Sequence, residues 1–298
     1  MPHQAPSLPR RSVLALLGGS ALAAACAHRG GGPDRIVEVA SGRELTRAEL
    51  LLQCRAVDHL LLGEQHDNPH HHQRRGALIA ELGAGTVVVA EHLERGRRVE
   101  AGADVRSRLD AAGFDARSWG WPLHEALFAP VLEAGLTVIG GNADQALVRQ
   151  AARQGEAAVP AALRDALRAA PLDAAAQAAL DRALVDGHCG QLPAARVPSM
   201  RLAQRLRDAS LALAMQASGG RPAVLVAGNG HVRLDHGVPV LLRRLQPQAR
   251  MLVVGFGEPD WRTEGAPYTH LWLTPTVARQ DPCAGFSLPA PRPASAPA

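Results

Sequence analysis

The sequence predicts an α/β domain with a mostly parallel central sheet flanked by helices, and three observations support this prediction. Short apolar runs alternate along the chain with segments of helical periodicity. The runs are continuously apolar, as expected of parallel strands buried on both faces. Apolar residues make up 47% of the 298 residues, so the chain can bury a sizeable core. The net charge of +4 is small and spread along the chain, which gives nucleic-acid binding little support.

The strands and helices can be assigned in order along the chain. We expect strands at residues 57–63, 86–91, 136–140, 223–227, 250–256 and 270–273, with an edge strand at 37–39. Helical patterns cover residues 69–82, 123–134, 143–153 and 238–245. Right-handed crossovers between parallel strands would place the carboxyl ends of all these strands at one edge of the sheet.

A helical insertion is expected at about residues 145–221, between the third and fourth main strands. This stretch contains no convincing strand and is rich in Ala, Leu and Arg. It can cover the strand ends as a lid, or form a helical flank far from any site. The sequence leaves both arrangements open.

The first 25 residues have the pattern of a secretory signal peptide. Arg10 and Arg11 precede an apolar stretch of residues 13–25, which is shorter than the roughly 20 residues that span a bilayer. Leu22-Ala23-Ala24-Ala25-Cys26 resembles a bacterial lipobox, which predicts acylation of Cys26. Ordinary signal-peptidase cleavage beside an accidental Cys is the alternative.

These features predict a lipid-anchored protein of the bacterial cell envelope. The expected domain organisation is a signal peptide at 1–25, a tether at 26–35, the α/β domain at 36–288 and a Pro/Ala-rich disordered tail at 289–298. No Asp follows Cys26, which favours the outer membrane, facing the periplasm.

Three cysteines remain beyond the lipobox: Cys54, Cys189 and Cys283. An odd number cannot pair completely within one chain. One disulfide is possible in an oxidising compartment, but the sequence does not choose the pair.

The densest chemical signal is the strand-to-helix turn at residues 63–72, which reads Gly-Glu-Gln-His-Asp-Asn-Pro-His-His-His. Asn68 is a good helix N-cap, and Pro69 suits the first helical position. Glu64 and His66 therefore belong to the turn, where α/β folds bind ligands. Of the three following histidines we expect His70 to face the turn, and His71 and His72 to be solvated.

Three further strands end in residues that can bind ligands. These are Glu91 in Ala90-Glu91-His92, Asn142 after Gly140-Gly141, and His231 in Gly228-Asn229-Gly230-His231. Four such endings at one sheet edge predict a functional site. His with carboxylate suits a divalent metal, with Glu as general base. His with Arg also suits haem. Aromatic residues could cover a porphyrin or belong to the core: Phe114, Trp119, Trp121 and Phe128.

These motifs, in this order, resemble the ChaN-like family of haem-binding lipoproteins, over about residues 36–275. The resemblance implies haem as cofactor, a homodimer with its haems face to face, an outer-membrane haem or iron receptor as partner, and a role in iron uptake. Members commonly carry an iron-ligating Tyr near the last strand, for which Tyr268 and His270 are the two alternatives in this chain. The expected haem-contacting residues are His66, His70, Trp121, Tyr268 and His270.

The wider group of Tiki, TraB and erythromycin-esterase proteins shares two Gly-x-x-His motifs and a Glu. This resemblance implies a second hypothesis, a metal-dependent hydrolase that binds Mn, Co or Zn. Its ligands would be Glu64, His66, Glu91 and His231, and Glu64 or Glu91 would act as the base. A third hypothesis is a non-catalytic lipoprotein that binds a partner through the helical insertion. We favour a protein that is not an enzyme.

Overall fold

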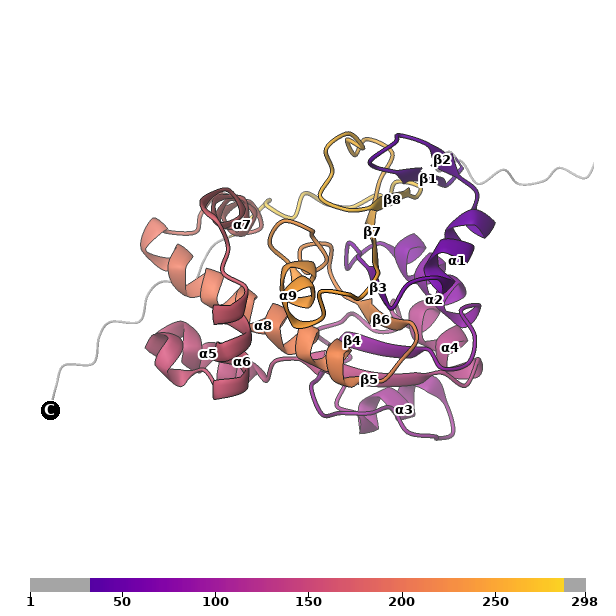
Figure 1. Ribbon diagram of the computed structural model, residues 1–298, viewed down its shortest axis with the longest axis horizontal. Helices are drawn as coiled ribbons and strands as arrows, with labels where there is room; N and C mark the ends of the chain where they lie inside the picture. Colours follow the sequence, from indigo (N-terminus) through magenta and orange to yellow (C-terminus); the bar gives the residue numbers. More distant parts are fainter. Residues whose placement is uncertain (1–32, 287–298) are drawn as a thin grey trace, which may run out of the picture. The chain divides into compact units, whose positions relative to one another are not determined.

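The computed structural model describes residues 33–286, which form a mixed eight-stranded sheet with helices on both faces (Figure 1). The expected signal peptide, Cys26, most of the tether and the tail at 289–298 lie outside the described residues. In order across the sheet, the strands are β2 (Glu44–Leu45), β1 (Arg35–Glu38), β8 (His270–Leu273), β7 (Met251–Gly257), β3 (His59–Leu62), β6 (Ala223–Val226), β4 (Val87–Glu94) and β5 (Thr137–Asn142).

The prediction of a mostly parallel sheet is confirmed. All neighbours from β8 to β5 pair in parallel, whereas β1 is antiparallel to both β2 and β8. The predicted edge position of the strand at 37–39 is wrong. The chain turns back after Glu38, so the short strand β2 pairs outside β1 and takes the edge.

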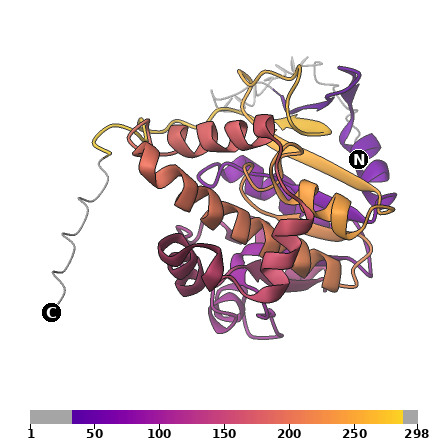
Figure 2. The same cartoon turned by 60° about the vertical axis from the view of Figure 1, so that its left-hand side comes forward.

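Side chains alternate between the two faces along each strand, and each face has its own helices. Leu60 and Leu62 pack with α1 (Arg47–Arg55), α2 (Pro69–Ala80), α3 (Val105–Ala111) and α4 (Glu125–Glu133). Leu61 points to the other face, toward α5 (Gln145–Gln154), α6 (Ala161–Ala169), α8 (Val197–Ala217) and α9 (Val238–Leu245). Figure 2 shows this second layer of helices in front of the sheet. Burial on both faces explains why the strands are apolar throughout.

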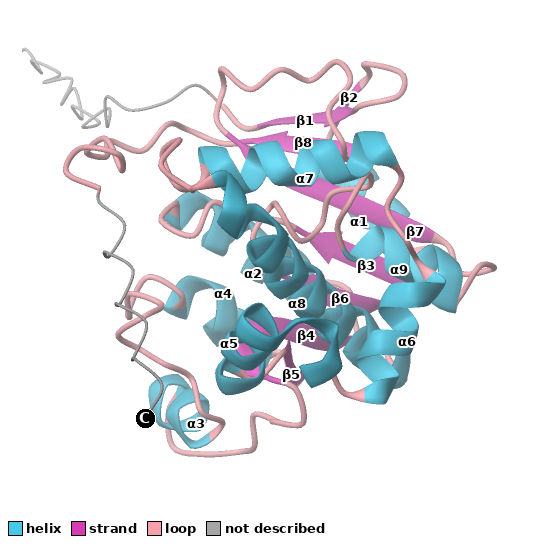
Figure 3. Cartoon of the chain, turned by 90° about the vertical axis from the view of Figure 1, so that its left-hand side faces the viewer, coloured by secondary structure: helices cyan, strands magenta, loops and turns pink. Residues whose placement is uncertain are grey.

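The helical insertion lies between β5 and β6, as expected. It contains α5, α6, α7 (Ala174–Asp186), α8 and two short 3-10 helices, at Gly155–Ala158 and Ala194–Arg196. In Figure 3 the long helix α8 lies across the sheet, and it contacts β4, β5 and β6 directly. The insertion is therefore a structural layer on the sheet, anchored by α8.

The start of α2 follows the predicted capping pattern. The Asn68 side chain accepts a hydrogen bond from the His70 main-chain N–H at 2.9 Å, and Pro69 is the first helical residue. The cap satisfies one of the free N–H groups at the helix start. It thereby fixes where the turn that carries Glu64 and His66 ends.

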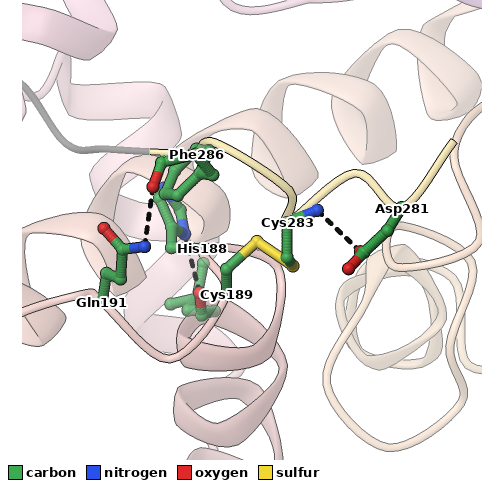
Figure 4. The surroundings of a disulfide bond; sticks show 7 residues. His188, Cys189, Gln191, Asp281, Cys283 and Phe286 are labelled. Atoms are coloured by element: carbon green, nitrogen blue, oxygen red, sulfur yellow. Dashed lines mark hydrogen bonds between the residues drawn. A yellow bond between two sulfur atoms is a disulfide. The ribbon is translucent and has the colours of Figure 1, made fainter.

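One disulfide joins Cys189, after α7, to Cys283, after β8 (Figure 4). The Gln191 side chain also donates to the carbonyl oxygen of Phe286 at 2.8 Å, beside the bond. Cys54 is buried and unpaired. Between residues 33 and 286, no helix has the length and apolar character needed to cross a membrane.

Candidate functional site at the carboxyl ends of the strands

The polar strand ends lie together at one edge of the sheet, as the sequence predicts. Glu64 and His66 follow β3, His231 follows β6, and Glu91 and Asn142 belong to β4 and β5. These four strands are consecutive neighbours in the sheet. The pairing of β4 with β5 is irregular between Ala90 and Glu94, so Glu91 lies where the regular ladder is interrupted.

Glu91 is the centre of the interactions between these strand ends. Its Oε2 accepts a hydrogen bond from the Gly228 N–H at 2.7 Å, and its Oε1 lies 3.3 Å from Nε2 of His231. Its carbonyl oxygen accepts from the Asn142 side chain at 2.9 Å. Glu91 thus ties the end of β4 to the ends of β5 and β6.

His231 lies between two carboxylates. Besides Glu91, it contacts Asp208 of α8, with 2.6 Å between Nδ1 and the carboxylate oxygen. Burial alone would lower the pKa of His231, but Glu91 and Asp208 raise it to about 10. Burial would raise the pKa of Glu91, yet the charge and hydrogen bond of His231 hold it well below its ordinary value. The three groups form a buried triad of charges.

His66 is the exposed imidazole of the site. Its Nδ1 lies 2.7 Å from Glu64 Oε1, and 49% of its side chain is accessible to solvent. Its Nε2 is beside Gly228, where a Cβ would lie 2.8 Å from that nitrogen. The rings of Trp119 and His66 are tilted by 66° in an edge-to-face pair, with 5.3 Å between centroids. Glu64 orients the ring, and the missing side chain at Gly228 leaves room beside Nε2.

Beneath His66 lies a buried histidine cluster, which consists of Glu64, His72, Arg75, His92 and His124. Arg75 forms an ion pair with Oε2 of Glu64, and His72 Nδ1 lies 3.0 Å from the same oxygen. Burial lowers the pKa of His72 to about 4 and that of His124 to about 3. At neutral pH both imidazoles are therefore uncharged.

The expectation that His71 and His72 are solvated is wrong, because both are fully buried. His71 packs against Phe256 and accepts from the Gln65 N–H at 3.0 Å, while His72 Nε2 lies 3.0 Å from the His66 carbonyl oxygen. The side chains of both His71 and His72 therefore contact the turn. The face of α2 that carries them packs on the sheet and on α4. The spacing of buried residues at 71, 72, 75, 76, 78 and 79 is helical, but it is visible only if His and Arg count as core residues.

A cavity of about 630 Å³ opens at the strand ends; we call it the strand-end cavity. The residues that matter for its chemistry are His66, Glu91, His92, Trp119, Arg149 and Arg207. Arg207 of α8 bonds the neutral side chains of Asn142 at 3.3 Å and Gln145 at 2.7 Å. Helices α5 and α8 of the insertion thus supply cationic groups to the cavity, so the insertion is not a flank far from the strand ends.

Four residues that the sequence predicted to contact haem do not line this cavity: His70, Trp121, Tyr268 and His270. Tyr268 packs on Gly255 and interacts with Arg233, and burial raises the pKa of its phenol to about 12. His270 lies on β8, which three strands separate from β4. Trp121 packs under Arg106, with 5.4 Å from the guanidinium carbon to the ring. His70 is half-buried in the first turn of α2.

The structure adds residues that the sequence did not single out. Arg149 and Arg207 line the cavity, Asp208 holds His231, and Arg75 and His124 lie beneath His66. The aromatic segment gave a partial signal, since it contains Trp119. Phe114 and Phe128 of the same segment belong to the core. Asp208 and Arg207 occur in a long helix without any local motif, so no sequence pattern marks them.

Comparison with known proteins relates residues 50–242 to one family. The family model for haem-binding uptake proteins of the Tiki superfamily, ChaN, matches residues 50–242. A structure described as cofacial haem binding to ChaN of Campylobacter jejuni superimposes with a TM-score of 0.66 at 14% identity, over 81% of this chain and 96% of that one.

A distant structural match is an erythromycin esterase, EreC, in its open conformation, with a TM-score of 0.39 at 12% identity, over 82% of this chain and 83% of that one. No curated protein matches this chain in sequence.

Proposed function

The chain belongs to the ChaN family of haem-binding proteins in the Tiki superfamily, and on this premise we propose that it binds haem in the strand-end cavity, with His66 as an iron ligand. One observation carries the assignment of the residue. The His66 imidazole is oriented through Nδ1 by Glu64, is half-exposed, and has room beside Nε2 because residue 228 is Gly.

The residues present fit haem. The cavity volume of about 630 Å³ is within the range of about 300–1,000 Å³ that is usual for small-molecule sites. Trp119 offers an aromatic face or edge to a macrocycle beside His66. Arg149 and Arg207 line the same cavity and are suited to the propionates, since guanidinium pairs strongly with carboxylate. Bound haem would supply an iron centre, and the chain would hold and orient it.

The first experiment is a haem titration of the purified protein, followed at the Soret band. We expect saturable binding, and at least about tenfold weaker binding with a shifted Soret maximum for His66→Ala. Tyr268→Phe and His270→Ala serve as comparisons, because both residues are candidate ligands from the sequence. If either of these variants loses binding and His66→Ala does not, the ligand assignment to His66 is wrong. If the wild type shows no Soret band, the haem proposal fails.

We further propose that two copies of the chain associate when haem binds. The related Campylobacter jejuni protein is described as binding haem cofacially, and a cavity that opens to solvent would leave one haem face available to a partner. Analytical ultracentrifugation with and without haem tests this. A monomer at every haem concentration argues against it.

A role in iron or haem uptake at the cell envelope is part of the proposal. It rests on the lipobox-like sequence at Cys26, which predicts a lipid anchor in the outer membrane. An outer-membrane haem or iron receptor as partner is part of the same proposal and rests on the resemblance to the family. Mass spectrometry of the mature N-terminal peptide should show an acylated Cys26. Recovery of Cys26→Ser in the membrane fraction, at the level of the wild type, would argue against a lipid anchor.

A metal-dependent hydrolase is the second candidate function. The observation in its favour is that Asp208 holds Nδ1 of His231, the arrangement that commonly orients a metal-binding histidine. The ligands would be Glu64, His66, Glu91 and His231, with Glu64 or Glu91 as base. Hydrolysis of peptide or ester substrates by protein loaded with Mn, Co or Zn, and its loss in Glu91→Gln, would favour this function over haem binding.

A further inference from the structure

The buried histidine cluster contains two imidazoles that the haem proposal does not use, those of His92 and His124, and both face Glu64. Nε2 of His92 lies 3.6 Å from Oε1 of Glu64, and Nε2 of His124 lies 3.7 Å from the same oxygen. One ligand atom from each of the three residues lies within 4.8 Å of the others. In residues 33–286 this is the one such set of three.

The imidazoles of this set lack hydrogen-bond partners although they are buried. Neither ring nitrogen of His92 has a partner among the described residues, and its side chain is fully buried. The ring nitrogens of His124 also lack one, although the Trp119 main chain lies nearby. Buried polar groups are nearly always paired, so unpaired nitrogens that face a carboxylate indicate a missing partner.

Arg75 leaves one oxygen of Glu64 available to such a partner. The guanidinium and Nδ1 of His72 are both at Oε2, whereas Oε1 contacts Nδ1 of His66 at 2.7 Å and also faces His92 and His124. The guanidinium of Arg75 thus pairs with Oε2 and does not cover Oε1, the oxygen that faces the imidazoles of His92 and His124. The carboxylate can therefore be shared between Arg75 and a second cation.

We propose that Glu64, His92 and His124 bind a divalent transition-metal ion of the zinc class, separate from haem. Two imidazoles and one carboxylate are a donor set that zinc takes in proteins, with a fourth position left open. Metal–ligand bonds of about 2.0–2.2 Å place tetrahedral ligand atoms about 3.3–3.6 Å apart. Nε2 of His92 and Nε2 of His124 lie 3.6 and 3.7 Å from Oε1 of Glu64, so the side chains need to move little to bind one ion.

An ion can reach this set through the strand-end cavity, because His92 lines the cavity together with His66 and Trp119. His66 Nδ1, at 2.7 Å from Oε1, lies beside this path. Neither His92 nor His124 has a carboxylate or carbonyl group to orient its second nitrogen. Such partners typically improve metal affinity about 10–100-fold, so we expect moderate affinity.

The test is a titration of the haem-free, chelator-treated protein with Zn²⁺ by calorimetry and with Co²⁺ by visible absorption. We expect one ion per chain and the visible bands of a low-coordinate Co²⁺ site. His92→Phe and His124→Phe should each weaken binding at least about tenfold. His59→Phe is the matched control, since His59 is also buried but bonds Gln246 at 2.6 Å. It should bind as the wild type does.

Circular dichroism and thermal unfolding confirm that each variant folds, and His92→Gln replaces His92→Phe if the latter does not. No binding by the wild type overturns the proposal, as does unchanged binding in the His92 variants. Because haem is absent throughout, a failure here leaves the haem proposal standing. A failure of the Soret titration likewise leaves the metal site standing.

Discussion

At the scale of single residues, Gly228 makes a testable contribution to the site. A Cβ there would lie 2.8 Å from His66 Nε2 and 3.8 Å from Glu91 Oε2, so Ala would take the space beside the imidazole. We expect Gly228→Ala to weaken haem binding at least about tenfold, which corresponds to about 1.4 kcal/mol. The measurement is the Soret titration, with thermal unfolding to follow stability.

Gly230→Ala is the matched control for this variant. Gly230 belongs to the same loop, but a Cβ there meets no atom within 4 Å. It should bind haem as the wild type does. Equal loss of affinity in both variants would mean that the loop backbone, and not the space beside His66, controls binding.

The triad of Glu91, His231 and Asp208 predicts a pH window for stability. The pKa of His231 is raised from 6.5 to about 10, so its contribution is fully present below pH 6.5 and is lost as the pH rises toward 10. The pKa of Glu91 is lowered from 4.5, so its contribution is present above pH 4.5 and is lost in acid. The triad thus favours the folded state most between pH 4.5 and 6.5.

Urea unfolding at pH 6 and pH 9 measures this effect. We expect the wild type to lose more than about 1 kcal/mol between the two, because one pKa unit corresponds to about 1.4 kcal/mol. His231→Gln should lose much less over the same interval, although it is less stable at pH 6. An equal loss in both proteins would assign the pH dependence to other groups.

How far the site could be predicted depends on whether a residue has a local signal. Glu64, His66, Glu91 and His231 each follow an apolar strand, and parallel topology then brings them to one edge. Asp208 and Arg207 have no such signal, because only the packing of α8 across the sheet brings them to the strand ends. Such residues depend on tertiary contacts and are invisible to local patterns.

At the scale of elements, the strands and helices expected from the sequence were placed within a few residues, but β2, α1 and α3 were not expected. The burial of polar residues on α2 was not predicted either. Asn68 and Pro69 specify where α2 begins through local hydrogen bonding. The direction of its polar face depends instead on α4, which packs against it. His71 and His72 look like surface residues in sequence but are turned toward the sheet by this packing.

The contact of α2 with α4 depends on Gly76. A Cβ at this position would overlap the carbonyl oxygen of Ala126 and come within 2.9 Å of that of Leu127. We expect Gly76→Ala to destabilise the protein by about 1–3 kcal/mol through overpacking. This would exceed the gain of about 1 kcal/mol that Ala brings to a helix. Urea unfolding measures the change.

Gln73→Ala, on the exposed face of the same helix, is the control for this effect. It should leave stability within about 0.5 kcal/mol of the wild type. If Gly76→Ala is as stable as the wild type, α4 is free to shift, and the contact does not fix its position.

At the scale of the whole molecule, the alternation of apolar strands and helices was sufficient to predict the α/β class. It could not predict the order β2-β1-β8-β7-β3-β6-β4-β5, in which β3 lies between β7 and β6. This order depends on which faces the crossover helices cover. The antiparallel pairing of β1 with β8 joins opposite ends of the domain, so no local pattern marks it.

The disulfide is also a property of the whole molecule, since Cys189 and Cys283 are 94 residues apart. It joins the helical insertion to the segment that follows the last strand, so it restricts the unfolded chain over a long loop. We expect the double variant Cys189→Ser with Cys283→Ser to lose about 2–4 kcal/mol of stability.

Cys54→Ser is the matched control, because Cys54 is buried and unpaired. Its loss of stability should arise from packing alone and should not change when a reductant is added. Burial raises the pKa of the Cys54 thiol to about 12, so it should not exchange with the disulfide in the folded protein.

Thiol titration in denaturant gives a direct measure of the same bond. Reduction should expose two additional thiols per chain in the wild type and none in the double variant. Structural disulfides are rare in reducing compartments. The number of thiols counted in protein isolated from its native host therefore also tests the cell-envelope proposal. Two additional thiols would agree with export, whereas a fully reduced chain in freshly isolated protein would argue for a reducing compartment and against the lipid anchor at Cys26.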